Sequence, residues 1–168
     1  MGVQAPQLDG GIAGDMGKTT TAARPAYRQA LEAIGWYFDQ QLYRGVFVAE
    51  VDDGYIGKAR PAEEDAELRG EGFTFPHDDV SALIAGMPGD STVVESASPL
   101  CPGGYHLFMR AVGEMCDRTG ARYVSILELT NGFILSFTTH TKDGRGVERR
   151  RRLLDRAGIE NLLTQAGI

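Results

Sequence analysis

Two stretches of the sequence, residues 27–60 and 105–138, align with each other at a shift of 78 positions without a gap. Nine of the 34 aligned positions are identical, whereas unrelated sequences of average composition would match at about two. The identical pairs are Tyr27/Tyr105, Ala33/Ala111, Gly35/Gly113, Asp39/Asp117, Arg44/Arg122, Val46/Val124, Glu50/Glu128, Gly54/Gly132 and Ile56/Ile134. An internal repeat of this kind predicts that the chain contains one structural unit twice.

Each copy begins with the pattern of a helix followed by a β-hairpin. Pro25 suits a first helical turn, and apolar residues recur at spacings of three, four and seven from Tyr27 and again from Tyr105. Apolar runs at 46–52 and 55–60 flank the pair Asp53-Gly54, and runs at 124–130 and 133–139 flank Asn131-Gly132. Both dipeptides are typical of two-residue type I′ turns, which require a positive φ at both central residues. We therefore predict a hairpin with this turn in each copy.

Further elements extend the repeat to most of the chain. We expect third strands at 72–75 and 147–154 and closing helices at 77–85 and 158–165. The predicted fold class is α+β, a tandem duplication of a helix–β-hairpin–strand–helix (αβββα) unit with antiparallel sheets in a pseudo-twofold arrangement. The predicted organisation is a flexible arm at 1–24, a first repeat at 25–87, a linker at 88–104 with a short strand at 92–95, and a second repeat at 105–168.

Composition and charge narrow the class of protein. The N-terminus lacks the basic segment followed by an apolar segment that is typical of a signal peptide. No apolar run reaches the roughly 20 residues of a membrane helix. We therefore expect a cytoplasmic protein with no membrane span. Two cysteines, Cys101 and Cys116, do not make a disulfide framework. The net charge of −6 is uneven: residues 27–104 carry −9 and residues 105–168 carry +3. The halves, or two copies, can therefore attract each other, although drift of solvated surfaces is an equal alternative.

The second hairpin is apolar on both faces. With a two-residue turn that pairs Leu129 with Ile134, one face carries Leu127, Leu129 and Ile134. The other face carries Val124, Ile126, Phe133, Leu135 and Phe137. A helix layer covers only one face, so the second face needs the other repeat, another subunit or a bound partner. We take the second set as the candidate partner-binding residues.

Few residues suggest chemistry. Glu50 and Glu128 are equivalent in the repeat and could meet at a pseudo-twofold axis, where paired carboxylates serve acid–base chemistry or bind a metal. The simpler interpretation is that each glutamate lies on a partly solvent-exposed face of the sheet, or forms an ion pair with Arg44 or Arg122. The string from Gly11 to Thr19 has the wrong glycine spacing for a phosphate-binding loop, and the histidines and cysteines lack ligand spacing. We predict no cofactor and no metal.

Four consecutive arginines, Arg149, Arg150, Arg151 and Arg152, form the densest basic run. Such a run can bind phosphate backbones, but on a strand alternate arginines point to opposite faces. Pairing with an acidic partner, or with an acidic segment such as residues 63–67, is the favoured use.

These patterns predict a non-enzymatic protein-interaction module: an adaptor, a chaperone-like binder or a small subunit of a larger assembly, with a protein partner or a second copy. Two alternatives stay open. One is an enzyme whose site between the repeats uses Glu50 and Glu128, and the other is nucleic-acid binding through Arg149–Arg152.

Overall fold

The computed structural model describes residues 24–61, 70–89 and 98–168. The first half of this part contains α1 (Tyr27–Gln40), β1 (Tyr43–Val51), β2 (Gly54–Pro61), β3 (Glu71–Pro76) and α2 (His77–Gly86). The second half contains α3 (Tyr105–Thr119), β4 (Arg122–Glu128), β5 (Phe133–His140), β6 (Val147–Leu154) and α4 (Arg156–Gln165). The α+β class is confirmed, and the third strands and closing helices lie where the sequence predicts them. The predicted arm up to residue 23, the strand at 92–95 and the acidic segment at 63–67 lie outside the described residues.

All six strands form one antiparallel sheet in the order β3-β2-β1-β4-β5-β6. The first strands of the two hairpins meet at its centre, where Phe47 pairs with Leu127, Val48 with Ile126 and Ala49 with Ser125. The two halves are therefore joined edge to edge through backbone hydrogen bonds, as one continuous sheet, and β3 and β6 are its edges.

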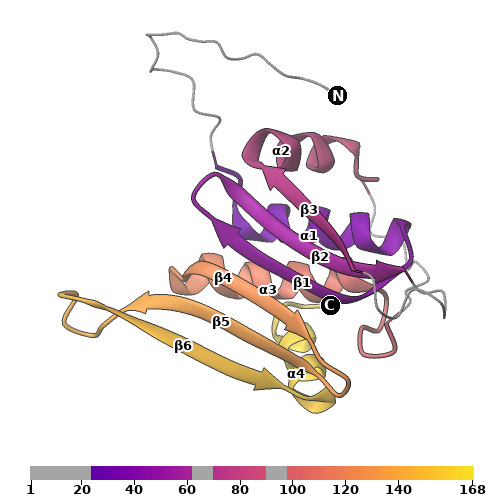
Figure 1. Cartoon of the computed structure of the whole chain (residues 1–168). Coiled ribbons are helices and arrows are strands. Elements are labelled where there is room, and N and C mark those ends of the chain that lie inside the picture. Colours follow the sequence, from indigo (N-terminus) through magenta and orange to yellow (C-terminus); the bar gives the residue numbers. More distant parts are fainter. Residues whose placement is uncertain (1–23, 62–69, 90–97) are drawn as a thin grey trace, which may run out of the picture.

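The four helices lie together on one face of this sheet (Figure 1). The core between the layers contains Val48 and Tyr55 from the first half, both about fully buried, and Ile126 and Phe133 from the second. The ring of Phe108 on α3 stacks on that of Phe133 with 4.2 Å between centroids. Side chains alternate between the two faces along a strand. Phe47, Ile56, Leu127 and Ile134, which are the chain neighbours of these core residues, therefore point to the face without helices.

The hairpin turns differ from the prediction. Val51 pairs with Gly54, and the Leu129 N–H donates to the Gly132 carbonyl, so the two-residue loops are residues 52–53 and 130–131. Neither Asp53 nor Asn131 has a positive φ, so the predicted type I′ turns at Asp53-Gly54 and Asn131-Gly132 are wrong. The register shifts with the loop: Leu127, not Leu129, pairs with Ile134.

The two turn glycines have another physical role. A Cβ at Gly54 would lie 2.1 Å from the Phe75 carbonyl oxygen, and a Cβ at Gly132 would lie 2.1 Å from the Leu154 carbonyl oxygen. Each glycine allows the end of a third strand to approach the start of the second strand of its hairpin. Both glycines are needed for this close backbone contact, and Gly54 also has a φ of 155°, which residues with a side chain rarely adopt.

Each central strand carries a β-bulge near its start. The register shifts between Arg44 and Phe47 in β1 and between Arg122 and Ser125 in β4. One residue in each bulge has a left-handed backbone, Gly45 at φ 61° and Tyr123 at φ 53°. A bulge leaves one N–H outside the ladder, and here the freed groups belong to Val46 and Val124, which donate to carboxylates instead.

Helices α1 and α3 lie side by side, and each caps the start of the other. Asp39 near the end of α1 accepts hydrogen bonds from the Tyr105 and His106 N–H groups at 2.8 and 3.0 Å. Asp117 near the end of α3 accepts from the Tyr27 and Arg28 N–H groups, both at 3.0 Å. Neither helix has a side-chain cap from its own N-cap residue. These exchanged caps satisfy N–H groups that a helix start leaves free.

Candidate functional site

The face of the sheet opposite the helices is the candidate site, and we call it the open face. No described element covers it (Figure 1). The strand register places Phe47, Leu127, Ile134 and Leu153 in one row across β1, β4, β5 and β6. Leu153 is 70% exposed and Leu127 is 38% exposed. A row of apolar side chains left in solvent marks a surface suited to contact with another molecule.

The charges of the strands are sorted between the two faces. Because side chains alternate along a strand, the register places Lys58, Arg149 and Arg151 on the open face, beside the apolar row. The glutamates of the strands all fall on the helix side; they are Glu50, Glu71, Glu128 and Glu148. The open face is therefore basic, although the whole chain carries −6.

The structure places the five apolar candidate residues on the other side of the sheet. They are Val124, Ile126, Phe133, Leu135 and Phe137, and none is more than 5% exposed. They pack beneath the helices as part of the core. The candidate contact surface is therefore the complementary set, which is Leu127 and Ile134 with their cross-strand neighbours. The sequence could not decide between the faces because both are apolar.

The arginine run lies on the edge strand β6, and all four side chains are exposed. Arg149 and Arg151 belong to the open face. Arg150 pairs with Glu148 at 2.7 Å, and Arg152 donates to the Met115 sulfur of α3 at 3.6 Å, so these two belong to the helix side. Only two of the four arginines therefore share a surface, and charges along an edge strand discourage pairing with a further strand.

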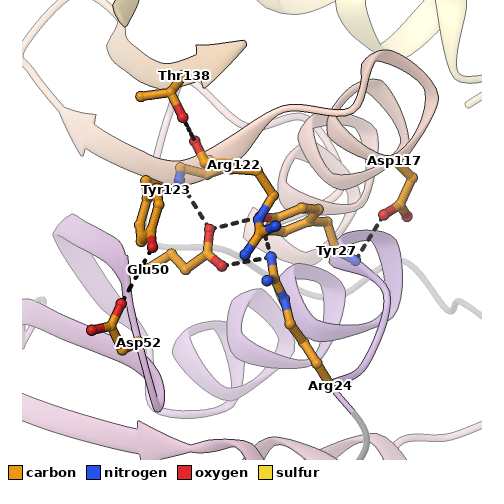
Figure 2. A network of polar contacts seen from close by, with 9 residues as sticks. Arg24, Tyr27, Glu50, Asp52, Asp117, Arg122, Tyr123 and Thr138 are labelled. Atoms are coloured by element: carbon orange, nitrogen blue, oxygen red, sulfur yellow. Dashed lines mark hydrogen bonds and ion pairs between the residues drawn. The ribbon is translucent and has the colours of Figure 1, made fainter. Parts of the chain in front are cut away.

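Glu50 is the centre of a buried polar network (Figure 2). Its carboxylate accepts a hydrogen bond from the Tyr27 hydroxyl at 2.7 Å and from the Val124 N–H at 3.2 Å, and forms an ion pair with Arg24 at 2.6 Å. Burial, helped by the hydrogen bond to Glu50, raises the pKa of the Tyr27 hydroxyl well above its ordinary value of 10. The network joins α1, β1 and β4, so it holds the two halves together.

Glu128 makes a second network of the same kind. It accepts from the Tyr105 hydroxyl at 2.6 Å, the Val46 N–H at 3.0 Å and the Ser98 hydroxyl at 2.6 Å. Burial and the negative charge of Glu128 raise the pKa of the Tyr105 hydroxyl well above its ordinary value. Ser98 stands where Arg24 stands in the Glu50 network. The Glu128 carboxylate therefore has no ion-pair partner among the described residues.

The two glutamates serve separate networks. Glu50 lies beside Val124, which precedes Glu128 by four residues on β4, or about 13 Å along an extended strand. Each carboxylate has its own donors and none is shared. Within the described ranges, no group of three or more His, Cys, Asp and Glu side chains could hold a metal ion. The contacts give both glutamates a structural role as acceptors for the bulge N–H groups.

A pocket opens where β1 and the β4–β5 hairpin part. Its volume is about 810 Å³, and its lining includes Arg44, Gly45, Arg60, Glu128 and Leu153. Leu153 also belongs to the apolar row, so the pocket lies at one end of the open face. This pocket was not among the sites predicted from the sequence. The one signal that could have pointed to it is the pair Gly45/Tyr123, which differs strongly in size at matched positions of the repeat.

Comparisons with protein-family models, curated proteins and solved structures find no match for this chain. Each helix in the described part of the chain is too short or too polar to span a bilayer.

Proposed function

We propose that this protein is a non-enzymatic interaction module that binds an acidic, partly apolar polypeptide on the open face of its sheet. The observation that carries the proposal is the uncovered row of Phe47, Leu127, Ile134 and Leu153 across four neighbouring strands. Burying about 100 Å² of apolar side chain contributes about 2.5 kcal/mol before the costs of association. An adaptor, a chaperone-like binder or a small subunit of an assembly would all use such a face.

Charge selects the occupant. Lys58, Arg149 and Arg151 lie beside the apolar row, and the strands place no carboxylate on that face. Two copies that met through their open faces would bring basic groups together, which opposes such a dimer. A partner that presents Asp or Glu beside apolar side chains is complementary in both respects. The apolar row favours a polypeptide over a nucleic acid, whose phosphates would use the cations alone.

The proposal can be tested with matched substitutions. Leu127→Asp and Leu153→Asp place a carboxylate on the open face, and Ile168→Asp places one on a residue of similar exposure to Leu127 outside the sheet. Proteins captured by the tagged chain from a nuclease-treated lysate of its native host are compared by mass spectrometry. We expect at least one acidic protein to be lost with both open-face variants and kept with Ile168→Asp.

Thermal unfolding of each variant separates lost binding from lost folding. A capture profile that is the same for the original chain and both open-face variants would refute the proposal. If the species lost with the open-face variants is a second copy of the chain itself, the face is assigned to self-association. If capture is seen only when the nuclease is left out, the face is assigned to nucleic acid.

We also infer that the chain is a tandem duplication whose halves are related by a pseudo-twofold axis between β1 and β4. Shifting the pair Phe47–Leu127 by 78 positions returns the pair Ala49–Ser125, which is also observed. The exchanged caps and the two Tyr–Glu networks repeat under the same shift. An experimental structure tests this, since one rotation of about 180° should superpose α1 and β1 on α3 and β4. A rotation far from that value would contradict the inference.

A further inference from the structure

The pocket beside Gly45 lies where the two halves differ at one pair of matched positions. Gly45 and Tyr123 occupy matched places in the two bulges, and both have a left-handed backbone. The Tyr123 ring lies between β4 and the β1–β2 turn, with its hydroxyl 3.4 Å from Asp52 (Figure 2). Gly45 has no side chain, and the corresponding place borders the cavity of about 810 Å³. One half of the molecule thus holds a tyrosine ring at this place, whereas in the other half the Arg60 guanidinium lies 2.7 Å from where a Gly45 Cβ would stand.

Arg44 gives the pocket an unmet requirement. Its Nε atom is buried and has no hydrogen-bond acceptor among the described residues. A buried donor of a charged group without an acceptor is costly. Arg60 on β2 lies opposite Arg44 on β1 in the strand register, and it also lines the pocket. An acceptor that entered here could therefore satisfy the Nε–H group of Arg44.

The carboxylates of the lining already have donors. Glu128 accepts from Tyr105, Ser98 and the Val46 N–H. Asp155 is the N-cap of α4 and accepts from the Gly158 N–H at 2.8 Å. These groups do not supply the acceptor that Arg44 lacks. The remaining lining includes the apolar side chains of Leu100, Leu129 and Leu153.

We propose that this pocket binds a carboxylate that is attached to a branched apolar group. The planar guanidinium presents two parallel N–H groups that match the two oxygens of a carboxylate. The leucine side chains provide the apolar wall for the attached group. The chain end of a peptide with a C-terminal leucine has this chemistry, and so does a free branched carboxylic acid. The proposal goes beyond binding on the open face and does not depend on it.

The direct test uses N-acetyl-leucine as the probe and N-acetyl-leucinamide as its matched control. Backbone NMR signals of the full chain are followed during each titration. N-acetyl-leucine should give saturable shifts at Arg44 and Gly45 with a Kd of about 1 mM, the range for a ligand of this size. The amide should bind at least about tenfold more weakly, because it cannot form the charged pair. Absence of saturable shifts, or equal binding of the amide, would overturn the proposal.

Two variants locate the site. Gly45→Tyr places in the first bulge the residue that the second bulge holds at a similar φ, and its Cβ would meet only the flexible end of Arg60 at 2.7 Å. Arg44→Gln keeps a polar, unbranched side chain but removes the charge and the guanidinium group. Each should weaken the binding of N-acetyl-leucine at least about tenfold, whereas Arg118→Gln at an exposed position of α3 should leave it unchanged. Unaltered affinity in Arg44→Gln would refute the site even if Gly45→Tyr failed to fold.

A second arm identifies the source of the carboxylate. A short acetylated peptide that ends in leucine is compared with N-acetyl-leucine. Binding that is more than about tenfold tighter, with added shifts at Leu127 and Ile134, assigns the site to the end of a polypeptide on the open face. Equal affinity assigns it to a small carboxylic acid. Both interpretations require that Arg44→Gln weakens the binding of N-acetyl-leucine. If it does not, the assignment of the ligand to this pocket is wrong.

Discussion

The exchanged helix caps predict that two chemically equal substitutions have unequal effects on stability. Asp39 and Asp117 each accept two backbone N–H groups at the start of the neighbouring helix. Asp39 is 3% exposed, whereas Asp117 is on the surface. Water can replace the lost acceptor at Asp117 but cannot reach the N–H groups below Asp39. Replacement of each by alanine therefore compares the same contact in two environments.

The magnitudes follow from the burial. Loss of a helix cap costs about 1 kcal/mol, which is the whole expected effect of Asp117→Ala. Asp39→Ala adds the penalty for leaving buried donors without an acceptor, about 1–3 kcal/mol. It also removes the partner of the buried His106 Nδ1, which lies 2.8 Å from the Asp39 carboxylate. We expect a loss of about 3 kcal/mol for Asp39→Ala.

Urea unfolding followed by circular dichroism measures both free energies. For a chain of this size the difference corresponds to roughly 5 °C or more in Tm. Asp39→Asn is the control, because it keeps the shape and one acceptor oxygen and should lie between alanine and the original residue. Equal losses for the two alanine variants, or a larger loss at Asp117, would refute the argument from burial.

Three further predictions concern the backbone and the tyrosines. Gly113→Ala should lose about 2 kcal/mol in urea unfolding, despite better helix propensity, because its Cβ would lie 2.5 Å from the Arg28 Cα; a gain would show that the helices can separate freely. Leu42 has a left-handed backbone with φ 55°, so Leu42→Gly should raise the free energy of unfolding by about 1 kcal/mol. Gly120 has φ 71°, so Gly120→Ala should lower the free energy of unfolding by a similar amount. Changes of the opposite sign would contradict this reasoning. The folded-state pKa of the Tyr105 hydroxyl is raised above its ordinary value of 10, so the contribution of Tyr105 to folding stability is complete below pH 10 and is lost as the pH rises further. The midpoint of urea unfolding should therefore fall above pH 10, and it should fall less steeply for Tyr105→Phe. Equal slopes of the midpoint against pH for the two proteins would contradict this prediction.

The local elements were predictable because the repeat shows the same signals twice. The helix stripes beginning at Tyr27 and Tyr105 and the strand at 147–154 agree with the structure. The turn prediction failed because Asp-Gly and Asn-Gly are also compatible with a loop one residue earlier. The close approach of a third strand to Gly54 and Gly132 depends on tertiary packing, which local preferences do not contain.

The site was predictable only in part, for two physical reasons. The pairing of β1 with β4 joins residues about 80 positions apart, and no local pattern specifies such a pairing. The choice between the faces depends on which side the helices cover, and Val124 and Leu127 are equally apolar candidates for either side. Asp39 and Asp117 were visible as an identical pair, but their role as exchanged caps needed the positions of both helices.

The most direct test of the open face is residue-specific photo-crosslinking in the native host. A photoreactive amino acid is placed at Leu127 or Leu153 on the open face, and at Ser81 on α2 or Glu160 on α4 as exposed controls. We expect Leu127 and Leu153 to capture the same acidic polypeptide and the helix positions not to capture it. We also expect the double substitution Arg149→Glu with Arg151→Glu to reduce the yield. Capture of that polypeptide only from the helix positions, or equally from all four, would contradict the account.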